Sequence, residues 1–395
     1  MRLIAAAVLL VVLLCSVCCA KNASPEMRVL WVERWNIVDE AECHKMVETA
    51  KKCNFNCLVV QVRGKGDTMF PCSTEPLGQE MRNAPAGFDP LAVIVKDAHK
   101  AGIQVHAWLN ANYAWGSNTP PLSPEHIVNS HPYWLMRYKT GEVKMASTPS
   151  YDGCFACPGH RAYVQHLANV YVEVAKKYDV DGICFDFIRY PNYDFCYCDW
   201  CLTRFRAEMD RKITAQQREA VSKDADRMAY VKAFPEQWSD FRRGLITSEL
   251  YRIHDAIKAV KPGIAVSASV FPGSNAYEDR LQDWKRWLAD GKLDLLFPML
   301  YVKSTDTFVK NVKEAMDASH GQPICPNIGS YLIPVDSTIE KIAKARELGA
   351  IGSGVYCWAI TNEGQDTSYL QTVCDKIWSR PASVPAISAT ATEAD

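Results

Sequence analysis

The sequence predicts an α/β fold, a closed (β/α)8 barrel of the TIM type. Short apolar β-rich runs alternate with amphipathic helices, the alternation occurs eight times, and several helices end in Gly just before the next run. Near-continuous apolar strands separated by helices are typical of a parallel sheet covered on both faces, and eight such units indicate a closed barrel. An open doubly wound sheet is the alternative, but no G-x-G-x-x-G fingerprint follows the first run.

The elements follow one another in a regular order. The predicted strands are 28–35 (RVLWVERW), 57–64 (CLVVQVRG), 104–112, 182–190 (GICFDFIRY), 265–271, 295–301, 323–330 and 351–359. Amphipathic helices are predicted between them, for example at 39–53, 89–102, 161–178 and 336–350. Two connections are long insertions: 64–89 after the second strand and 191–262 after the fourth. Long excursions at the carboxyl ends of barrel strands build the substrate cleft in such folds.

The two ends of the chain differ from the predicted barrel domain at 27–378. Residues 1–20 combine Arg2, an apolar run and small residues up to Ala20, which predicts a secretory signal peptide and a secreted or periplasmic protein. The apolar run is shorter than the roughly 20 residues that span a bilayer, so no stable membrane span is expected. A lipoprotein anchor is not expected either, because no early cysteine has the flanking residues that lipoprotein processing favours. The small, polar tail 380–395 is predicted to be disordered.

The charge, hydrophobicity and cysteine count of the chain bear on its partners and on its metal chemistry. The formal net charge of −1 gives no reason to expect nucleic acid as a partner, and 48% hydrophobic residues suffice for a large core. Sixteen cysteines are present, and thirteen follow the predicted signal. Because thirteen is odd, some of them must be buried thiols or metal ligands.

Polar residues at the carboxyl ends of barrel strands face the active site, so candidates can be named from sequence. Asp186 is the predicted catalytic acid, because a carboxyl in an apolar strand gains a raised pKa. The alternative is that Asp186 only pairs with Arg189 or Arg63. Glycoside cleavage needs a second carboxylate. Several qualify by position and none stands out: Glu33, Asp283, Asp67 and Glu363.

The other candidates fit the binding of a sugar, because aromatic faces stack on sugar rings while amide, Arg and carboxylate groups bind hydroxyls. The predicted substrate-binding residues are Arg63, Asp67, His106, Trp108, Asn110, Arg189, Tyr190, Tyr301 and Trp358. His106 could serve as a general base, but substrate binding is the favoured interpretation. It has no histidine partner at useful spacing, which argues against a metal-dependent hydrolase or deacetylase.

A cysteine-rich loop follows the fourth strand. Cys196, Cys198 and Cys201 form a C-x-C-x-x-C array whose sulfurs can converge on one tetrahedral ion. Cys157 is the expected fourth ligand, with Cys154 next. A site of four sulfurs is closed, so the expected ion is a structural zinc that holds the insertion beside Asp186. Two disulfides are the alternative.

Four segments together carry a resemblance to a known family: VQVRGKGDTMF, FDPLAVIVKDAHKAGIQVHAWLNAN, YDVDGICFDFIRYP and LQDWKRWLADGKLDLLFPMLY. Over about residues 27 to 375 the chain resembles glycosyl hydrolase-like family 10 of bacterial exported proteins. The resemblance implies a TIM barrel with glycosidase activity, in some members on peptidoglycan glycan strands stripped of peptides. Carried over by position, it implies functional roles for Arg63, Asp67, His106, Trp108, Asn110, Asp186, Tyr190 and Tyr301.

Two narrower likenesses bear on the metal and the acid. CYCDWCLTRFR with the earlier CPGH is similar to the zinc cluster of family 42 beta-galactosidases. DGICFDF, PMLY and GVYCWA resemble strands of family 18 chitinases, but the chitinase acid would fall at Ile188, so only Asp186 is shared.

The sequence therefore predicts an exported glycoside hydrolase acting on a polysaccharide or peptidoglycan glycan strand. A non-catalytic carbohydrate-binding barrel is the alternative, because the second carboxylate is not identified.

Overall fold

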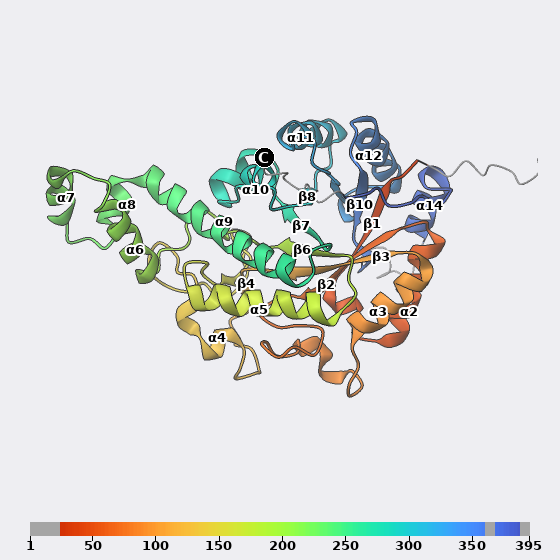
Figure 1. Ribbon diagram of the computed structural model, residues 1–395, viewed down its shortest axis with the longest axis horizontal. Coiled ribbons are helices and arrows are strands. Elements are labelled where there is room, and N and C mark those ends of the chain that lie inside the picture. Colours follow the sequence, from red (N-terminus) through yellow and green to blue (C-terminus); the bar gives the residue numbers. More distant parts are fainter. Residues whose placement is uncertain (1–23, 360–367, 388–395) are drawn as a thin grey trace, which may run out of the picture.

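The computed structural model describes residues 24–359 and 368–387. Eight parallel strands close into a barrel in the order β1-β10-β9-β8-β7-β6-β3-β2 (Figure 1). The barrel strands are β1 (Met27–Val32), β2 (Cys57–Arg63), β3 (Gln104–Asn110), β6 (Gly182–Asp186), β7 (Ala265–Val270), β8 (Leu295–Leu300), β9 (Asn327–Gly329) and β10 (Gly352–Tyr356). The predicted fold class is confirmed, and each of these strands lies within or next to one of the eight predicted runs.

Helices follow the strands and surround the barrel. They are α2 (Glu40–Lys52), α3 (Pro90–Ala101), α5 (Arg161–Lys177), α9 (Pro235–Val260), α10 (Trp284–Ala289), α11 (Thr305–Ala318), α12 (Val335–Glu347) and α14 (Ser368–Ile377). Side-chain caps define several helix starts: Asp39 accepts from the N–H of Glu42, and Asp89 from that of Ala92. Within the described residues, no helix combines the length and apolarity needed to cross a membrane.

Three connections on the carboxyl side of the strands are long. Residues 64–89 contain one short 3-10 helix (Gln79–Asn83). Residues 111–160, which the sequence does not predict as a long insertion, carry the small antiparallel pair β4 (Tyr113–Trp115) and β5 (Cys154–Phe155). After β6 come α6 (Asp199–Met209), α7 (Ala215–Ser222) and α8 (Ala229–Ala233). Together with the first half of α9 they project away from the barrel (Figure 1).

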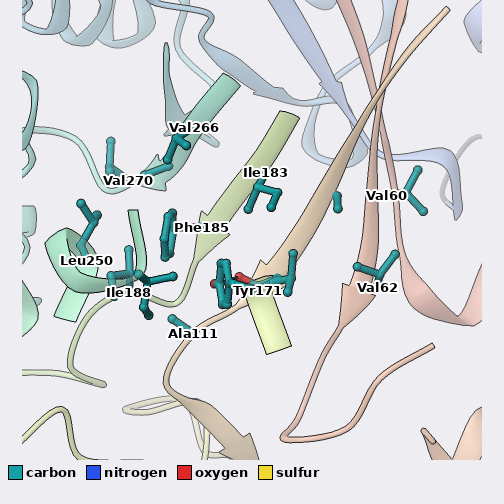
Figure 2. Packing of buried hydrophobic residues seen from close by; sticks show 14 of the residues in the cluster. Val60, Val62, Ala111, Tyr171, Ile183, Phe185, Ile188, Leu250, Val266 and Val270 are labelled. Atoms are coloured by element: carbon teal, nitrogen blue, oxygen red, sulfur yellow. Dashed lines mark hydrogen bonds between the residues drawn. The ribbon is translucent and has the colours of Figure 1, made fainter. Parts of the chain in front are cut away.

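Apolar side chains form two layers. The outer layer fills the space between strands and helices, where Phe185 of β6 stacks on Tyr171 of α5 at 4.6 Å between ring centroids (Figure 2). The inner layer fills the barrel and contains aromatic rings and buried thiols: Trp31, Trp108, Phe297, Cys57, Cys184 and Cys325. Alternate residues of each strand therefore point inward, as in other barrels of this kind.

The floor of the barrel, at the amino ends of the strands, is covered by the C-terminal segment. The Glu26 N–H donates to the Ser383 carbonyl at 3.0 Å, and the Asn56 side chain donates to the Ala382 carbonyl at 2.9 Å. Val384 and Ile387 pack against the inner layer. Residues 380–387 of the expected tail thus lie against the barrel, while the predicted signal at 1–20 and residues 388–395 lie outside the described residues.

Candidate active site

A cavity of about 340 Å³ opens at the carboxyl ends of the strands. Aromatic rings make up half of its lining: Trp31, Trp35, Trp108, Tyr113, Phe187, Tyr301 and Tyr356. The rest of the lining consists of Gly64, Met299 and five polar side chains: Arg34, Gln61, Lys65, Asn110 and Asp186. Ligand pockets have volumes of about 300 to 1,000 Å³, so this cavity, called the cleft below, is of a size to hold a small ligand or one section of a longer one.

Asp186 is the last residue of β6 and, within residues 24–359 and 368–387, the one acid in the lining of the cleft. Its side chain follows Gly182 and Cys184 on the inward face of the strand, and the residue is 6% exposed. Burial raises the pKa of Asp186 to about 6, although the Phe187 N–H donates to Oδ1 at 2.7 Å and Arg189 adds a nearby positive charge. The carboxyl therefore keeps its proton up to about pH 6 and loses it as the pH rises further.

The strand that carries Asp186 ends earlier than predicted. The apolar run GICFDFIRY predicts a strand up to residue 190, but Phe187 adopts a φ of 50°, in the left-handed region that an aromatic residue seldom occupies. This turn directs the chain away from the barrel just after the carboxyl. Backbone strain of this kind concentrates at functional sites.

Trp108 and Asn110 form one wall beside Asp186. Trp108 Nε1 donates to Asn110 Oδ1 at 2.8 Å, and Asn110 Nδ2 donates to the Gly64 carbonyl at 3.0 Å. Trp31 packs edge-on against Trp108, with 5.1 Å between ring centroids. These contacts fix the ring of Trp108 and the amide of Asn110 in single orientations.

Tyr301 and Tyr356 form the opposite wall. Their ring centroids lie 5.1 Å apart, and the half-exposed Tyr331 lies 6.1 Å from the ring of Tyr301. Of the predicted site residues, the structure thus brings four to the cleft: Asp186, Trp108, Asn110 and Tyr301.

His106 lies elsewhere, on the floor of the barrel. It points inward like Trp108 and Asn110, but it stands beside Gly182 at the start of β6, where any β-carbon on residue 182 would collide with the imidazole. Burial lowers the pKa of His106 to about 4, so the ring is neutral. The structure does not bring His106 to the cleft, because inward positions of one strand lie at different depths of the barrel.

Arg63 and Asp67 are held in buried ion pairs. Arg63 donates to both carboxylate oxygens of Glu75, at 2.8 and 2.6 Å, and to the carbonyl oxygens of Asn110 and Ala111. Asp67 accepts from Arg34, and this contact outweighs burial and lowers the pKa of Asp67. Neither side chain lines the cleft, and both secure the insertion at 64–89 to the barrel.

The remaining predicted residues surround the cleft at a greater distance. Glu33 is buried and accepts from the Cys357 thiol and from the Ala359 N–H at 3.5 Å. Asp283 lies at the start of α10. Arg189 lies behind Phe187, 4.5 Å from its ring centroid, and pairs with Asp152.

Tyr190 and Trp358 are fully buried, and Glu363 lies outside the described residues. Glu33, Asp283, Arg189, Tyr190 and Trp358 do not line the cleft.

The four predicted metal ligands converge in one buried cluster at the start of α6. The sulfurs of Cys157, Cys196, Cys198 and Cys201 all lie within 4.8 Å of one another. A tetrahedral zinc with Zn–S bonds of about 2.3 Å requires sulfurs roughly 3.8 Å apart. The Cys157 sulfur lies 3.4 Å from that of Cys201 and 4.0 Å from that of Cys198.

Other features of the cluster also suit a metal ion. Backbone N–H groups of Arg137 and Cys201 point at the sulfurs of Cys196 and Cys198, at 3.4 and 3.5 Å. A β-carbon on Gly159 would lie 2.8 Å from the Cys201 sulfur, so only Gly fits there. The donor set and its spacing therefore fit a structural zinc, and all four thiols are free in this structure.

Several residues around the cleft were not found from sequence. Trp31 and Gln61 occupy inward positions that strand alternation could have marked. Tyr113 and Asp152 come from the segment at 111–160, which shows no regular period. Glu249, on α9, is a buried acid whose Oε2 accepts from the Asn112 side chain at 2.9 Å, and burial raises its pKa to about 8.

Comparison with known proteins agrees with the geometry. Residues 26–335 match the family described as Glycosyl hydrolase-like 10. The glycosyl hydrolase YngK of Bacillus subtilis is 23% identical over 309 residues, which cover 70% of this chain and 54% of YngK. The glycosyl hydrolase DigH of Escherichia coli K12 is 23% identical over 280 residues, covering 64% of this chain and 55% of DigH. The chain thus spans about half the length of these relatives.

Among solved structures, the glycoside hydrolase domain of PgaB (BpsB) from Bordetella bronchiseptica superposes with a TM-score of 0.65 at 14% identity. The match covers 89% of this chain and 99% of that domain. At this identity the likeness concerns the fold alone.

Proposed function

Because the chain belongs to the glycosyl hydrolase-like 10 family, we propose that it is a glycoside hydrolase that cleaves bonds within a polysaccharide or a peptidoglycan glycan strand. The relatives that match it are also named glycosyl hydrolases. The observation that carries the proposal is the position of Asp186, a buried acid with a raised pKa in the lining of an aromatic cleft.

In the proposed reaction, Asp186 delivers its proton to the oxygen of the leaving sugar. A carboxyl with a pKa of about 6 still holds its proton in mildly acidic solution and releases it readily, which suits a general acid. The aromatic walls provide flat apolar faces for sugar rings. The fixed amide of Asn110 and the side chain of Gln61 can bind hydroxyl groups.

We also propose that a structural zinc occupies the cluster of Cys157, Cys196, Cys198 and Cys201. When bound, the ion would cross-link the segment before α5 to the loop after β6, which is the connection that leaves Asp186. Export by the segment 1–20 is part of the same proposal, because it would place the enzyme with extracytoplasmic glycans.

One observation favours a second candidate, a non-catalytic carbohydrate-binding barrel. Among the residues that the structure describes, Asp186 is the one carboxyl in the cleft lining, whereas glycoside hydrolysis by the usual routes needs two. Incubation with peptide-free glycan strands and a panel of polysaccharides separates the two candidates. New reducing ends would support the hydrolase, whereas tight binding without products would support the binding protein.

A further inference from the structure

A buried arginine without a carboxylate partner lies on α9. Among the residues that the structure describes, three arginines are at most 1% exposed: Arg34, Arg63 and Arg242. The first two pair with carboxylates. Arg242 has no ion pair within the described part of the chain, and its buried Nε and Nη2 atoms have no hydrogen-bond acceptor there. Because a buried charge is costly without a compensating charge nearby, the position of Arg242 calls for a negative partner.

Aromatic rings surround the guanidinium instead. Its central carbon lies 4.6 Å from the ring centroid of Tyr193, 5.2 Å from that of Trp238 and 5.3 Å from that of Tyr197. The ring of Tyr190 is 5.9 Å away. Such contacts attract a cation, but an aromatic ring carries no net charge. The rings therefore leave the positive charge of Arg242 unbalanced.

The loop that carries three of the four thiols contacts this guanidinium. Arg242 Nη1 donates to the carbonyl of Tyr193 at 2.6 Å and to that of Phe195. The Phe195 carbonyl belongs to the peptide that leads into Cys196, so bond lengths alone keep Nη1 at most about 10 Å from the Cys196 sulfur. The ring of Tyr197, the next residue after Cys196, lies against the same guanidinium. Arg242 therefore lies beside the ligand loop.

The cluster becomes negatively charged when it binds a metal ion. Cysteine binds zinc as a thiolate, so four thiolates around Zn²⁺ have a net charge of about −2. All four cysteines are buried. Where water is excluded, the attraction between opposite charges is stronger than it is at the surface. A bound zinc would thus supply the negative partner that Arg242 lacks.

Two other arginines lie near the loop, and both differ from Arg242. Arg227 donates to the Tyr197 carbonyl, but its side chain is 39% exposed and pairs with Asp199 at 2.8 Å. Solvent and its own carboxylate therefore reduce its effect on the cluster. Arg137 offers its backbone N–H to the Cys196 sulfur, while its guanidinium donates to a carbonyl at residue 141.

We infer that Arg242 is the counter-charge of the zinc site, a residue that binds no metal itself but raises the affinity of the four sulfurs for the ion. This inference rests on the zinc proposed for the cluster. The guanidinium stabilises the negative zinc–thiolate group electrostatically. Its two carbonyl contacts also hold the ligand loop against α9.

The test measures the zinc affinity of the full chain by competition with a chromophoric chelator at neutral pH. We expect Arg242→Met, which removes the charge, to weaken zinc binding by about 10- to 100-fold. Arg242→Lys keeps the charge and should stay within about threefold of the wild type. The matched control is Arg243→Met, since Arg243 is the next residue of α9 and also lies over an aromatic ring, but pairs with Asp240 at 2.6 Å. The control should bind zinc as the wild type does.

Melting temperatures separate this role from a purely structural one. In the zinc-free chain the charge of Arg242 has no partner, so Arg242→Met should change the melting temperature little. The zinc-loaded variant should melt below the zinc-loaded wild type, because weaker binding stabilises the fold less. The rise in melting temperature on addition of zinc should therefore be smaller in Arg242→Met than in the wild type.

Two results would overturn the inference while leaving the zinc in place. One is a zinc affinity of Arg242→Met within about threefold of the wild type. The other is an equal fall in melting temperature with and without zinc, because Arg242 would then only pack α9 against the loop. Should Arg242→Met fail to fold, Arg242→Gln takes its place, and a loss of about tenfold or more in Arg242→Lys would also contradict the inference. A wild-type chain that binds no zinc would instead refute the proposed zinc site itself.

Discussion

Arg63 and Glu75 form a fully buried two-point ion pair that ties the insertion at 64–89 to the end of β3. Burial opposes charge on both groups, yet Arg63 with His166 lowers the pKa of Glu75 to about 2. Glu75→Gln would leave the Arg63 guanidinium buried without its counter-charge. We expect a loss of about 3 to 5 kcal/mol in the free energy of unfolding, measured by urea denaturation. The exposed pair of Glu219 with Lys223 supplies the control, and Glu219→Gln should change stability little.

Asp186→Asn should abolish cleavage while sugar binding persists, because the amide keeps the shape of the acid but cannot donate its proton. Reducing-end release and binding to the same glycan are the two measurements. In the wild type, kcat/KM should fall as the pH rises above about 6, where Asp186 loses its proton. Full activity of the Asn variant would remove the catalytic assignment.

Glu249 should make the fold less stable in mildly alkaline solution. Burial raises its pKa from 4.5 to about 8, so between these two pH values the folded chain holds a proton that the unfolded chain has lost. The free energy of unfolding therefore carries no penalty from Glu249 below about pH 4.5. It falls as the pH rises from there toward 8, by at most about 1.4 kcal/mol per pH unit. Glu249→Gln should flatten the curve of unfolding free energy between pH 6 and 8. Parallel curves for the two proteins would contradict this prediction.

The thiol cluster should bind one zinc per chain. Metal analysis of the Cys198→Ser variant should find little zinc, because only three of the four sulfur ligands remain. The melting temperature of this variant should also fall below that of the wild type. Cys154→Ser is a matched control, since Cys154 is buried in β5, three residues from Cys157, but outside the cluster. Equal metal content in the two variants would refute the assigned ligand set.

Trp35 offers a test of the aromatic cleft. It is 51% exposed and lines the cavity, so Trp35→Ala should remove a stacking surface without disturbing the core. We expect KM to rise about tenfold, in line with about 1 to 1.5 kcal/mol for a lost aromatic contact. Tyr133→Ala, at an exposed ring outside the cleft, should leave KM unchanged. A similar change in both variants would indicate a general effect on the surface.

The strands could be predicted because each is an apolar run buried on both faces, as at 57–64 and 182–190. The structure brings Trp108, Asn110, Asp186 and Tyr301 to one cleft because all lie at or near the carboxyl ends of their strands. His106 was also predicted to face the active site, but it lies on the floor of the barrel. The two-residue alternation of a strand gives the face on which a residue lies but not its depth in the barrel.

Arg63 was misplaced for a different reason. The register of β2 against β3 shifts between Gln61 and Arg63, so Arg63 pairs with the outward-facing Leu109 and turns toward the helices. Its partner Glu75 lies in a loop whose sequence has no helical or strand periodicity, and the same holds for Asp152. Contacts of this kind depend on how irregular segments fold back, which strand and helix patterns do not encode.

The C-terminal segment lies against β1 on the floor of the barrel, opposite the cleft. Both Glu26 and Ile387 are therefore near the same closed base. A bead, a surface or a fused protein could be attached near Glu26 or near Ile387. In either case the cleft would face the surrounding solution. A large, insoluble ligand would then reach the cleft of the immobilised chain without being blocked by the support.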